Sequence, residues 1–421
     1  MPRSAGAEER RTYIGADACE ELVEFLNRHG VTRVVSVADK NTDVAVGDHL
    51  YHRLAESGLT ITRVVLPGEE VIADEWYLAK LLVSAPTENC VFVSVGAGTI
   101  TDITRLVSHR MKMPFVSYPT AASVDGFTSI GAPVVLDGVK ITLIAQPPVA
   151  IFADLNVLSN APIELTAAGF GDMLGKLTAI ADWRLGNLVW SEPYEETIAR
   201  RTLSAVDVCT ENASEIARRS QLGLQRLIEA LIESGDCMLD FGTSRPASGS
   251  EHHISHYWEM KLLQESRPAI LHGAKVAVAT AMIAQLYDRI RELTVAEVEK
   301  RLNNTWLPER ESERRTIRAA YGTTADSVIA EHTPFLEMTA EHYDRIKQCI
   351  ITQWDRILAI ADEVPRADFI RRQLYEVKAP STPEELGLSA DEVRAGRLYA
   401  HYLRNRFTVV KLARMLGLHS E

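Results

Sequence analysis

The sequence predicts an α/β domain over residues 1–160, followed by an all-α domain over residues 161–421. A chain of 421 residues is comfortable for two domains at about 150 residues each. Short apolar runs alternate with helical patterns up to about residue 160, and strand signals nearly vanish after Leu155. Because parallel neighbours need crossover connections, strands that alternate with helices indicate a largely parallel sheet.

Five apolar runs in the first part have the β-rich composition of strands. They occupy 31–39, 61–68, 90–98, 113–120 and 148–155. The segment 73–85 has helical spacing instead. In the second part, Pro162 precedes small and apolar residues at helical spacing up to 185, and 202–220 and 222–234 are also helical in pattern. Ser381 and Thr382 before acidic residues predict a further helix start at 381–386.

The composition excludes several classes of protein. With 46% hydrophobic and 24% charged residues the chain can bury sizeable cores. A net charge of −12 argues against a protein built to bind nucleic acid or an anionic membrane. No run approaches the roughly 18 to 20 apolar residues that span a bilayer, and the polar start lacks the apolar core of a signal peptide. Five scattered cysteines without a CxxC pair indicate buried free thiols in the cytoplasm.

A glycine turn follows the third strand. Gly96 and Gly98 stand where the strand turns into a helix, so a phosphate could approach the backbone and the helix N-terminus. Turn geometry alone explains such glycines equally well. Asp102 would lie in the first helical turn as a cap or backbone anchor, and Asp39, after the first strand, is either a partner for a ribose hydroxyl or a capping residue.

The stretch PTAASVDGFTS at 119–129 follows the next strand, at the edge where α/β sheets open their clefts. Thr120, Ser123 and Ser129 could hydrogen-bond a cofactor, and Asp125 a substrate hydroxyl. A plain turn-rich loop is the alternative.

Three of the twelve histidines fall in SGSEHHISH at 248–256. His252 and His256 are four residues apart, so a helix places both on one face, whereas His253 points elsewhere. His272 stands at a helix start, and Asp172 interrupts an apolar helix. One aspartate and two histidines would fill three positions around Zn²⁺, Ni²⁺ or Fe²⁺ and leave one for substrate. In the alternative, Asp172 is only an i,i+4 partner of Lys176.

Five motifs together resemble the sn-glycerol-1-phosphate dehydrogenase family, including its AraM-type enzymes. They are VGAGTITD, PTAASVDGFTS, AAGFGDMLGKLTAIADWRL, SGSEHHISH and LHG, in this order over roughly residues 20 to 290. The family belongs to the iron-containing alcohol dehydrogenase and dehydroquinate synthase-like superfamily. The resemblance implies a nucleotide-binding α/β domain, a helical domain and a metal in the cleft between them. It also implies reduction of glycerone phosphate with NADH or NADPH, and a homo-oligomer is expected.

The resemblance also assigns residues. It implies metal ligands at Asp172, His252 and His272, and substrate contacts at Asp125, Asp172 and His256. It implies cofactor contacts along the turn and the following loop, at Gly98, Thr99, Ile100, Thr101, Asp102, Thr120, Ala121, Ala122, Ser123 and Ser129. The glycine turn and the strand end add Gly96 and Asp39 as further cofactor candidates, and Asp39 favours NAD. Arg245 is our candidate for the substrate phosphate because guanidinium binds phosphate in a bidentate manner, and Lys176 is the second choice.

The sequence departs from the family pattern in several places. Ala97 stands where the family often has a third glycine, Thr101 stands where an apolar residue is common, and the chain continues past the matched motifs as a helical extension. The alternatives are a dehydroquinate-synthase-like cyclase acting on a sugar phosphate, another metal-dependent polyol or alcohol dehydrogenase, and a nucleotide-binding protein without catalysis. SGSEHHISH, in place of a GHxxGH pattern, argues against the cyclase.

Overall fold

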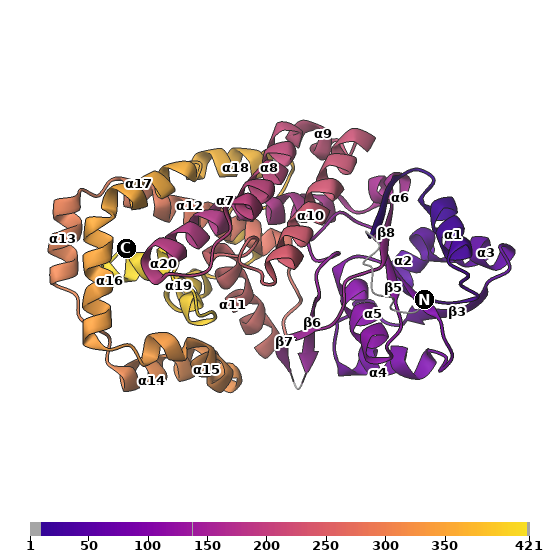
Figure 1. Ribbon diagram of the computed structural model, residues 1–421, viewed down its shortest axis with the longest axis horizontal. Coiled ribbons are helices and arrows are strands. Elements are labelled where there is room, and N and C mark those ends of the chain that lie inside the picture. Colours follow the sequence, from indigo (N-terminus) through magenta and orange to yellow (C-terminus); the bar gives the residue numbers. More distant parts are fainter. Residues whose placement is uncertain (1–9, 137, 419–421) are drawn as a thin grey trace. The chain divides into compact units, whose positions relative to one another are not determined.

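A computed structural model describes residues 10–136 and 138–418 (Figure 1). The chain forms two compact units. One comprises the residues up to 169 together with 208–239, and the other comprises 170–207 together with the residues from 240 onward. Three helices, α7, α8 and α10, continue across these boundaries. The division into two domains near residue 160 stays a prediction.

The first unit contains a six-stranded sheet in the described residues, with the order β1-β8-β5-β4-β2-β3. All its pairings are parallel, which confirms the predicted sheet type. Its strands are β1 (Arg11–Gly15), β2 (Arg33–Asp39), β3 (Thr60–Leu66), β4 (Val91–Val95), β5 (Phe115–Tyr118) and β8 (Ala150–Asp154). From β2 the chain first adds β3 at the edge and then returns to add β4 on the other side of β2. The strand order therefore reverses between β2 and β4, where open α/β sheets bind ligands at their carboxyl ends.

The five predicted strands correspond to β2, β3, β4, β5 and β8, and the predicted helix at 73–85 is α4 (Glu75–Ser84). Three strands were not predicted. One is β1 at the edge of the sheet, and the others form an antiparallel ribbon of β6 (Gly131–Leu136) and β7 (Val139–Ile144).

Both faces of the sheet are covered, since alternate residues of β2 pack into two different cores. Val34 and Ala38 pack with α1 (Ala18–Arg28) and α3 (Asp48–Glu56). Val35 and Val37 pack with α4 and α5 (Gly98–Arg110) on the other face. The near-continuous apolar run of β2 is therefore the pattern of a strand buried on both faces.

Helices account for the rest of the described elements. Between β2 and α3 lie the short α2 (Lys40–Thr42) and a π-helical turn (Asp43–Gly47), and α6 (Leu155–Asn160) follows β8. The long helices that follow are α7 (Ile163–Trp190), α8 (Glu196–Glu211), α10 (Gln221–Phe241), α11 (Ser250–Gln264) and α12 (His272–Arg291), with the short α9 at Ala213–Ala217. The later ones are α13 (Val295–Asn303), α14 (Arg310–Tyr321), α15 (Ala325–Leu336), α16 (Ala340–Thr352), α17 (Trp354–Glu363), α18 (Ala367–Glu376), α19 (Ala390–Tyr399) and α20 (Val409–Met415). Up to residue 418 no described strand follows β8, which confirms the predicted change of character.

The helix start predicted at 381–386 is wrong. This segment contains a single 3₁₀ turn, Glu384–Leu386, that ends at Gly387 with a positive φ of 70°. The side chain of Glu385 accepts hydrogen bonds from the backbone N–H groups of Ser381 and Thr382, so the capping pattern closes a local turn. The helix begins later, at Ala390, where Ser389 and Glu392 form a reciprocal capping box.

Among the described residues, no helix is long and apolar enough to cross a membrane. All five cysteines are free thiols, and four of them are buried, as the sequence predicted; Cys349 is partly exposed.

Candidate active site

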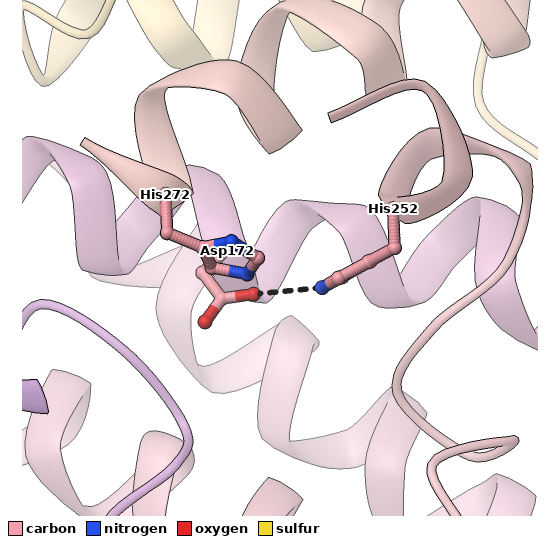
Figure 2. Close-up of side chains that lie close together, drawn as sticks. All are labelled: Asp172, His252 and His272. Carbon is pink, nitrogen blue, oxygen red and sulfur yellow. Dashed lines mark ion pairs between the residues drawn. The ribbon is translucent and has the colours of Figure 1, made fainter. Parts of the chain in front are cut away.

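Three predicted metal ligands meet in the second unit, although they are up to 100 positions apart in the sequence. Asp172 comes from α7, His252 from the first turn of α11, and His272 is the first residue of α12. One ligand atom from each lies within 4.8 Å of the other two (Figure 2). His252 Nε2 lies 3.4 Å from Asp172 Oδ1, and the His252 and His272 ring centroids are 5.3 Å apart. The three side chains are thus directed at one point.

The protonation states of Asp172 and His272 suit a cation. Burial favours the neutral form of Asp172, but Lys176 and the two histidines outweigh it and hold the pKa of Asp172 well below its usual value. Burial lowers the pKa of His272 well below its usual value, so its imidazole is neutral near pH 7. For His252, contacts with Asp172 and Glu251 overcome burial and raise the pKa. An ionised carboxylate beside a neutral imidazole is a donor set that divalent transition metals accept.

Lys176 lies one turn after Asp172 on α7. Its Nζ is 2.6 Å from Asp172 Oδ1, and both side chains are fully buried. The i,i+4 pair expected from the sequence is therefore present, and it coexists with the histidine cluster. The same carboxylate oxygen, Asp172 Oδ1, faces both the ammonium of Lys176 and Nε2 of His252.

Sequence reasoning missed two glutamates that lie behind the α11 histidines. His252 Nδ1 is 2.8 Å from Glu251 Oε1, and His256 Nδ1 is 3.4 Å from Glu259 Oε2. The buried Lys275 on α12 places its Nζ 3.3 Å from Glu259 Oε1. A signal was available, because Glu259 lies three residues after His256, which is one helical turn. Glu251 had no such signal, since adjacent helical residues do not face each other.

The histidines of α11 lie in different surroundings. The His256 ring lies 5.5 Å from that of His272, and its side chain is 31% exposed, so it borders the cluster from the solvent side. His256, Glu259 and His272 form a second group whose ligand atoms lie within 4.8 Å. His253 is buried, and burial lowers its pKa well below the usual value. It packs in the protein interior.

The glycine turn lies at the carboxyl end of β4, beside the point where the strand order reverses. A Cβ on Gly96 would lie 2.5 Å from Ile100 Cβ, so close packing of the turn on its own helix requires glycine there. A Cβ on Gly98 would be 3.3 Å from Val124, a tight but tolerable contact. No side chain caps the N-terminus of α5 among the described residues. Its first N–H groups point out at the end of the helix, which is the arrangement that binds phosphate.

The loop at 119–129 is attached to this turn. Thr120 N donates to Gly96 O, and Gly96 N donates to Tyr118 O. Thr120, Ala121, Ala122 and Ser123 are all buried. The two segments predicted to bind the dinucleotide are thus hydrogen-bonded to each other in the first unit, which also contains Asp39 and Asp125.

Asp125 and Ser129, which were predicted to contact ligands, form hydrogen bonds within the protein. Asp125 is buried, and Ser234 Oγ on α10 donates to its Oδ2 at 2.9 Å. Ser129 Oγ accepts from Gly131 N at 2.8 Å, at the start of β6. Both contacts fix the position of the loop.

The two candidate aspartates near the turn have structural contacts. Asp39 ends β2 and caps α2, because Thr42 N donates to its Oδ1 at 2.8 Å. The expectation that Asp102 lies in the first turn of its helix is wrong, since it is the fifth residue of α5. It pairs at 2.7 Å with the buried Arg105, which also donates to the carbonyls of Gly126, Phe127 and Gly131. Burial raises the pKa of Asp102 to about 7.

Arg245 belongs to the second unit and is an ion-pair partner of Glu192. Its Nε donates to Glu192 Oε2 at 2.9 Å, and its side chain is 22% exposed. Glu192 is buried and also accepts from Phe407 N. The carboxylate of Glu192 thus balances the positive charge of Arg245.

Comparison with known proteins agrees with these features. The iron-containing alcohol dehydrogenase family model matches residues 13–162, which contain most of the sheet and the glycine turn. A glycerol-1-phosphate dehydrogenase [NAD(P)+] of Halalkalibacterium halodurans is 38% identical over 401 residues, which are 94% of this chain and 90% of that protein. The protein of the same name from Bacillus subtilis is 35% identical over 402 residues, or 95% and 89% of the two chains.

The chain belongs to the glycerol-1-phosphate dehydrogenase family. Because the aligned region covers 94% of the chain, the family match extends well beyond the residues 20 to 290 that the motifs indicated. Solved structures show the same fold. They include a glycerol dehydrogenase from Schizosaccharomyces pombe (TM-score 0.64, 16% identity, 97% of this chain and 88% of that one) and a 1,3-propanediol oxidoreductase (TM-score 0.63, 16% identity, 97% of each).

Proposed function

We propose that this protein is a metal-dependent oxidoreductase that interconverts glycerone phosphate and sn-glycerol 1-phosphate with NAD(P)H or NAD(P)⁺. The observation that carries the proposal is the convergence of Asp172, His252 and His272 from three helices. The family relationship at 35–38% identity over most of the chain supports the substrate class and the nucleotide.

In this proposal Asp172, His252 and His272 hold one divalent ion, Zn²⁺, Ni²⁺ or Fe²⁺. Such an ion would supply a Lewis acid that stabilises negative charge on a ketone oxygen. The low pKa of Asp172 and the neutral His272 mean that two ligands are deprotonated before any ion binds. The donor set combines one carboxylate with two imidazoles, which suit Zn²⁺, Ni²⁺ and Fe²⁺, and offers no thiolate.

Further side chains of the two units would hold the substrate in this proposal. His256 borders the cluster at 31% exposure and would hydrogen-bond a substrate hydroxyl and pass a proton, since an imidazole titrates near neutral pH. Asp125, held by Ser234, would accept from a second hydroxyl. For the phosphate we retain Arg245, because Lys176 is fully buried against Asp172.

The nicotinamide nucleotide would bind in the first unit, where it supplies or accepts the hydride. The turn Gly96–Gly98 and the uncapped start of α5 suit its pyrophosphate. The remaining contacts are proposed at Thr99 to Asp102, Thr120 to Ser123 and Ser129. Asp39 lies at the carboxyl end of β2, and its carboxylate would repel a 2′-phosphate, which favours NAD.

Two further parts of the proposal concern the setting of the enzyme. A cytoplasmic location is supported by the five free cysteines, since thiols stay reduced there. The expectation of a homo-oligomer is retained as part of the proposal.

The deciding experiment is an NADH and NADPH oxidation assay with a panel of ketone phosphates, with each metal added in turn and the stereochemistry of the product determined. We expect turnover with glycerone phosphate and formation of the sn-1 isomer. A cyclase would consume no net NADH. Purified, metal-supplemented protein without NAD(P)H oxidation would contradict the proposal.

A further inference from the structure

We propose that Glu251 is a positioning residue that fixes the orientation and the tautomer of His252 as a metal ligand. The inference rests on the proposed metal site and adds to it a carboxylate that contacts no substrate. Sequence motifs gave Glu251 no role.

The geometry of His252 defines which nitrogen faces the cluster. Its Nδ1 lies 2.8 Å from Glu251 Oε1, and its Nε2 lies 3.4 Å from Asp172 Oδ1. An ionised carboxylate can only accept a hydrogen bond, so Nδ1 must carry the proton. In a neutral imidazole the lone pair then lies on Nε2, directed at Asp172. Glu251 thus selects the one tautomer in which His252 can bind a metal shared with Asp172.

Glu251 is itself held rigidly. It is fully buried, its Oε1 accepts from Gly249 N at 2.6 Å, and its Oε2 accepts from Thr178 Oγ1 at 2.7 Å. The carboxylate is therefore bound on both oxygens, by the start of α11 and by α7. A carboxylate fixed at both ends orients its histidine far better than a mobile surface residue.

Two glycines make room for this carboxylate. A Cβ on Gly249 would lie 2.9 Å from Glu251 Oε2, and a Cβ on Gly175 would lie 3.4 Å from Glu251 Cγ and 2.7 Å from Val276. Larger residues at either position would push the glutamate or its neighbours away. The close packing of α7, α11 and α12 around Glu251 thus depends on small residues at these contacts.

The charge of Glu251 also affects binding strength. A carboxylate on the far nitrogen of a ligating histidine raises the basicity of the ring, and loss of such a partner typically weakens metal binding about 10- to 100-fold. Glu259 offers a matched comparison on the same helix, because it stands behind His256, which is not a proposed ligand.

The test compares Zn²⁺ affinity in the full-length wild type, Glu251→Gln and Glu259→Gln, by competition with a chelator. Glutamine keeps the size of glutamate and an oxygen acceptor, so the fold is retained, which circular dichroism checks. We expect about 10- to 100-fold weaker binding for Glu251→Gln and little change for Glu259→Gln. Wild-type affinity in Glu251→Gln overturns the inference. The reverse ranking also overturns it, and then points to the group His256, Glu259 and His272 as the metal site.

A second readout needs neither metal nor activity. In ¹⁵N-histidine-labelled metal-free protein at alkaline pH, NMR should find the His252 proton on Nδ1, with the signal assigned by its loss in His252→Asn. A proton on Nε2 contradicts the inference. The two proposals fail separately: an active enzyme whose Glu251→Gln variant binds Zn²⁺ normally refutes only the role of Glu251. A protein that loses affinity in this variant but never oxidises NAD(P)H refutes only the proposed reaction. A wild type that binds no Zn²⁺ refutes both.

Discussion

The ammonium of Lys176 and the carboxylate of Asp172 form a fully buried ion pair, with Nζ 2.6 Å from Oδ1, one turn apart on α7. The ammonium of Lys176 therefore balances the negative charge of Asp172, which is also a proposed metal ligand. When one partner of a buried pair is removed, the other is left as an uncompensated charge.

We predict that Lys176→Met destabilises the metal-free protein by about 3 to 5 kcal/mol. Added Zn²⁺ should restore much of the loss, because the cation replaces the missing ammonium beside Asp172. The measurement is the Tm with and without Zn²⁺, and the zinc-induced increase should be larger in the variant than in the wild type. Equal increases in the two proteins would show that Asp172 does not contact the ion.

The metal ligands have a direct test. His252→Ala and His272→Ala each remove one of three donors, so we expect purified variants to lose bound metal, measured by elemental analysis. His253→Ala is the control, since this buried histidine belongs to the same helix but not to the cluster. Full metal stoichiometry in either ligand variant would rule out the assignment.

The two glycines of the turn should respond differently to alanine. In Gly98→Ala the new Cβ meets Val124 at 3.3 Å, so the fold tolerates it while the methyl group stands where a phosphate would approach. We expect weaker NADH binding, by fluorescence titration, with little change in Tm. In Gly96→Ala the Cβ would lie 2.5 Å from Ile100 Cβ, so Tm itself should fall. Unchanged NADH affinity in Gly98→Ala would remove this turn from the nucleotide site.

We predict that the free energy of unfolding depends on pH because Asp182 is buried. Burial, together with the charge of Glu251, raises its pKa to about 6. In the unfolded chain its pKa is about 3.9, so between these values the folded state holds the proton more strongly. This contribution to stability is therefore present below about pH 4 and is lost as the pH rises through 6.

Urea unfolding of the wild type and Asp182→Asn at several pH values isolates this effect. The variant should be less stable at neutral pH by about 1 to 3 kcal/mol, because Ser250 N loses a carboxylate acceptor. The stability difference between the two proteins should vary between pH 4 and 6 and level off above. A constant difference across this range would show that Asp182 does not titrate there.

Sequence patterns predicted the central part of the fold well. Buried strands such as β2 and β4 are near-continuous apolar runs, and this pattern can be recognised without knowing which helices pack on them. The edge strand β1, with the sequence RTYIG, mixes charged and apolar residues. Its own sequence therefore does not predict a strand, and its pairing with β8 is seen only in the folded protein. The β6–β7 ribbon did have a signal, because an Asp-Gly pair separates two apolar runs in the sequence.

The candidate site could be predicted from residue types that are unusual in their surroundings. An aspartate in an apolar helix and histidines four apart stand out, so Asp172, His252 and His256 could be found from residue types alone. Their supporting contacts could not, because Glu251 and Thr178 meet only after α7 and α11 pack, 73 positions apart in the chain. Likewise, a capping sequence such as 381–386 can precede either a helix or a single turn, so the sequence alone does not distinguish the two.

Asp182 also bears on the order in which the site is completed during synthesis. Its carboxylate accepts from Ser250 N at the start of α11, from Tyr287 on α12 and from Val409 N at the start of α20. A nascent chain that has emerged only as far as His272 already carries every proposed ligand but lacks both later donors. The hydrogen bonds around Asp182, which hold the start of the helix that bears His252, are therefore complete only after α20 has left the ribosome.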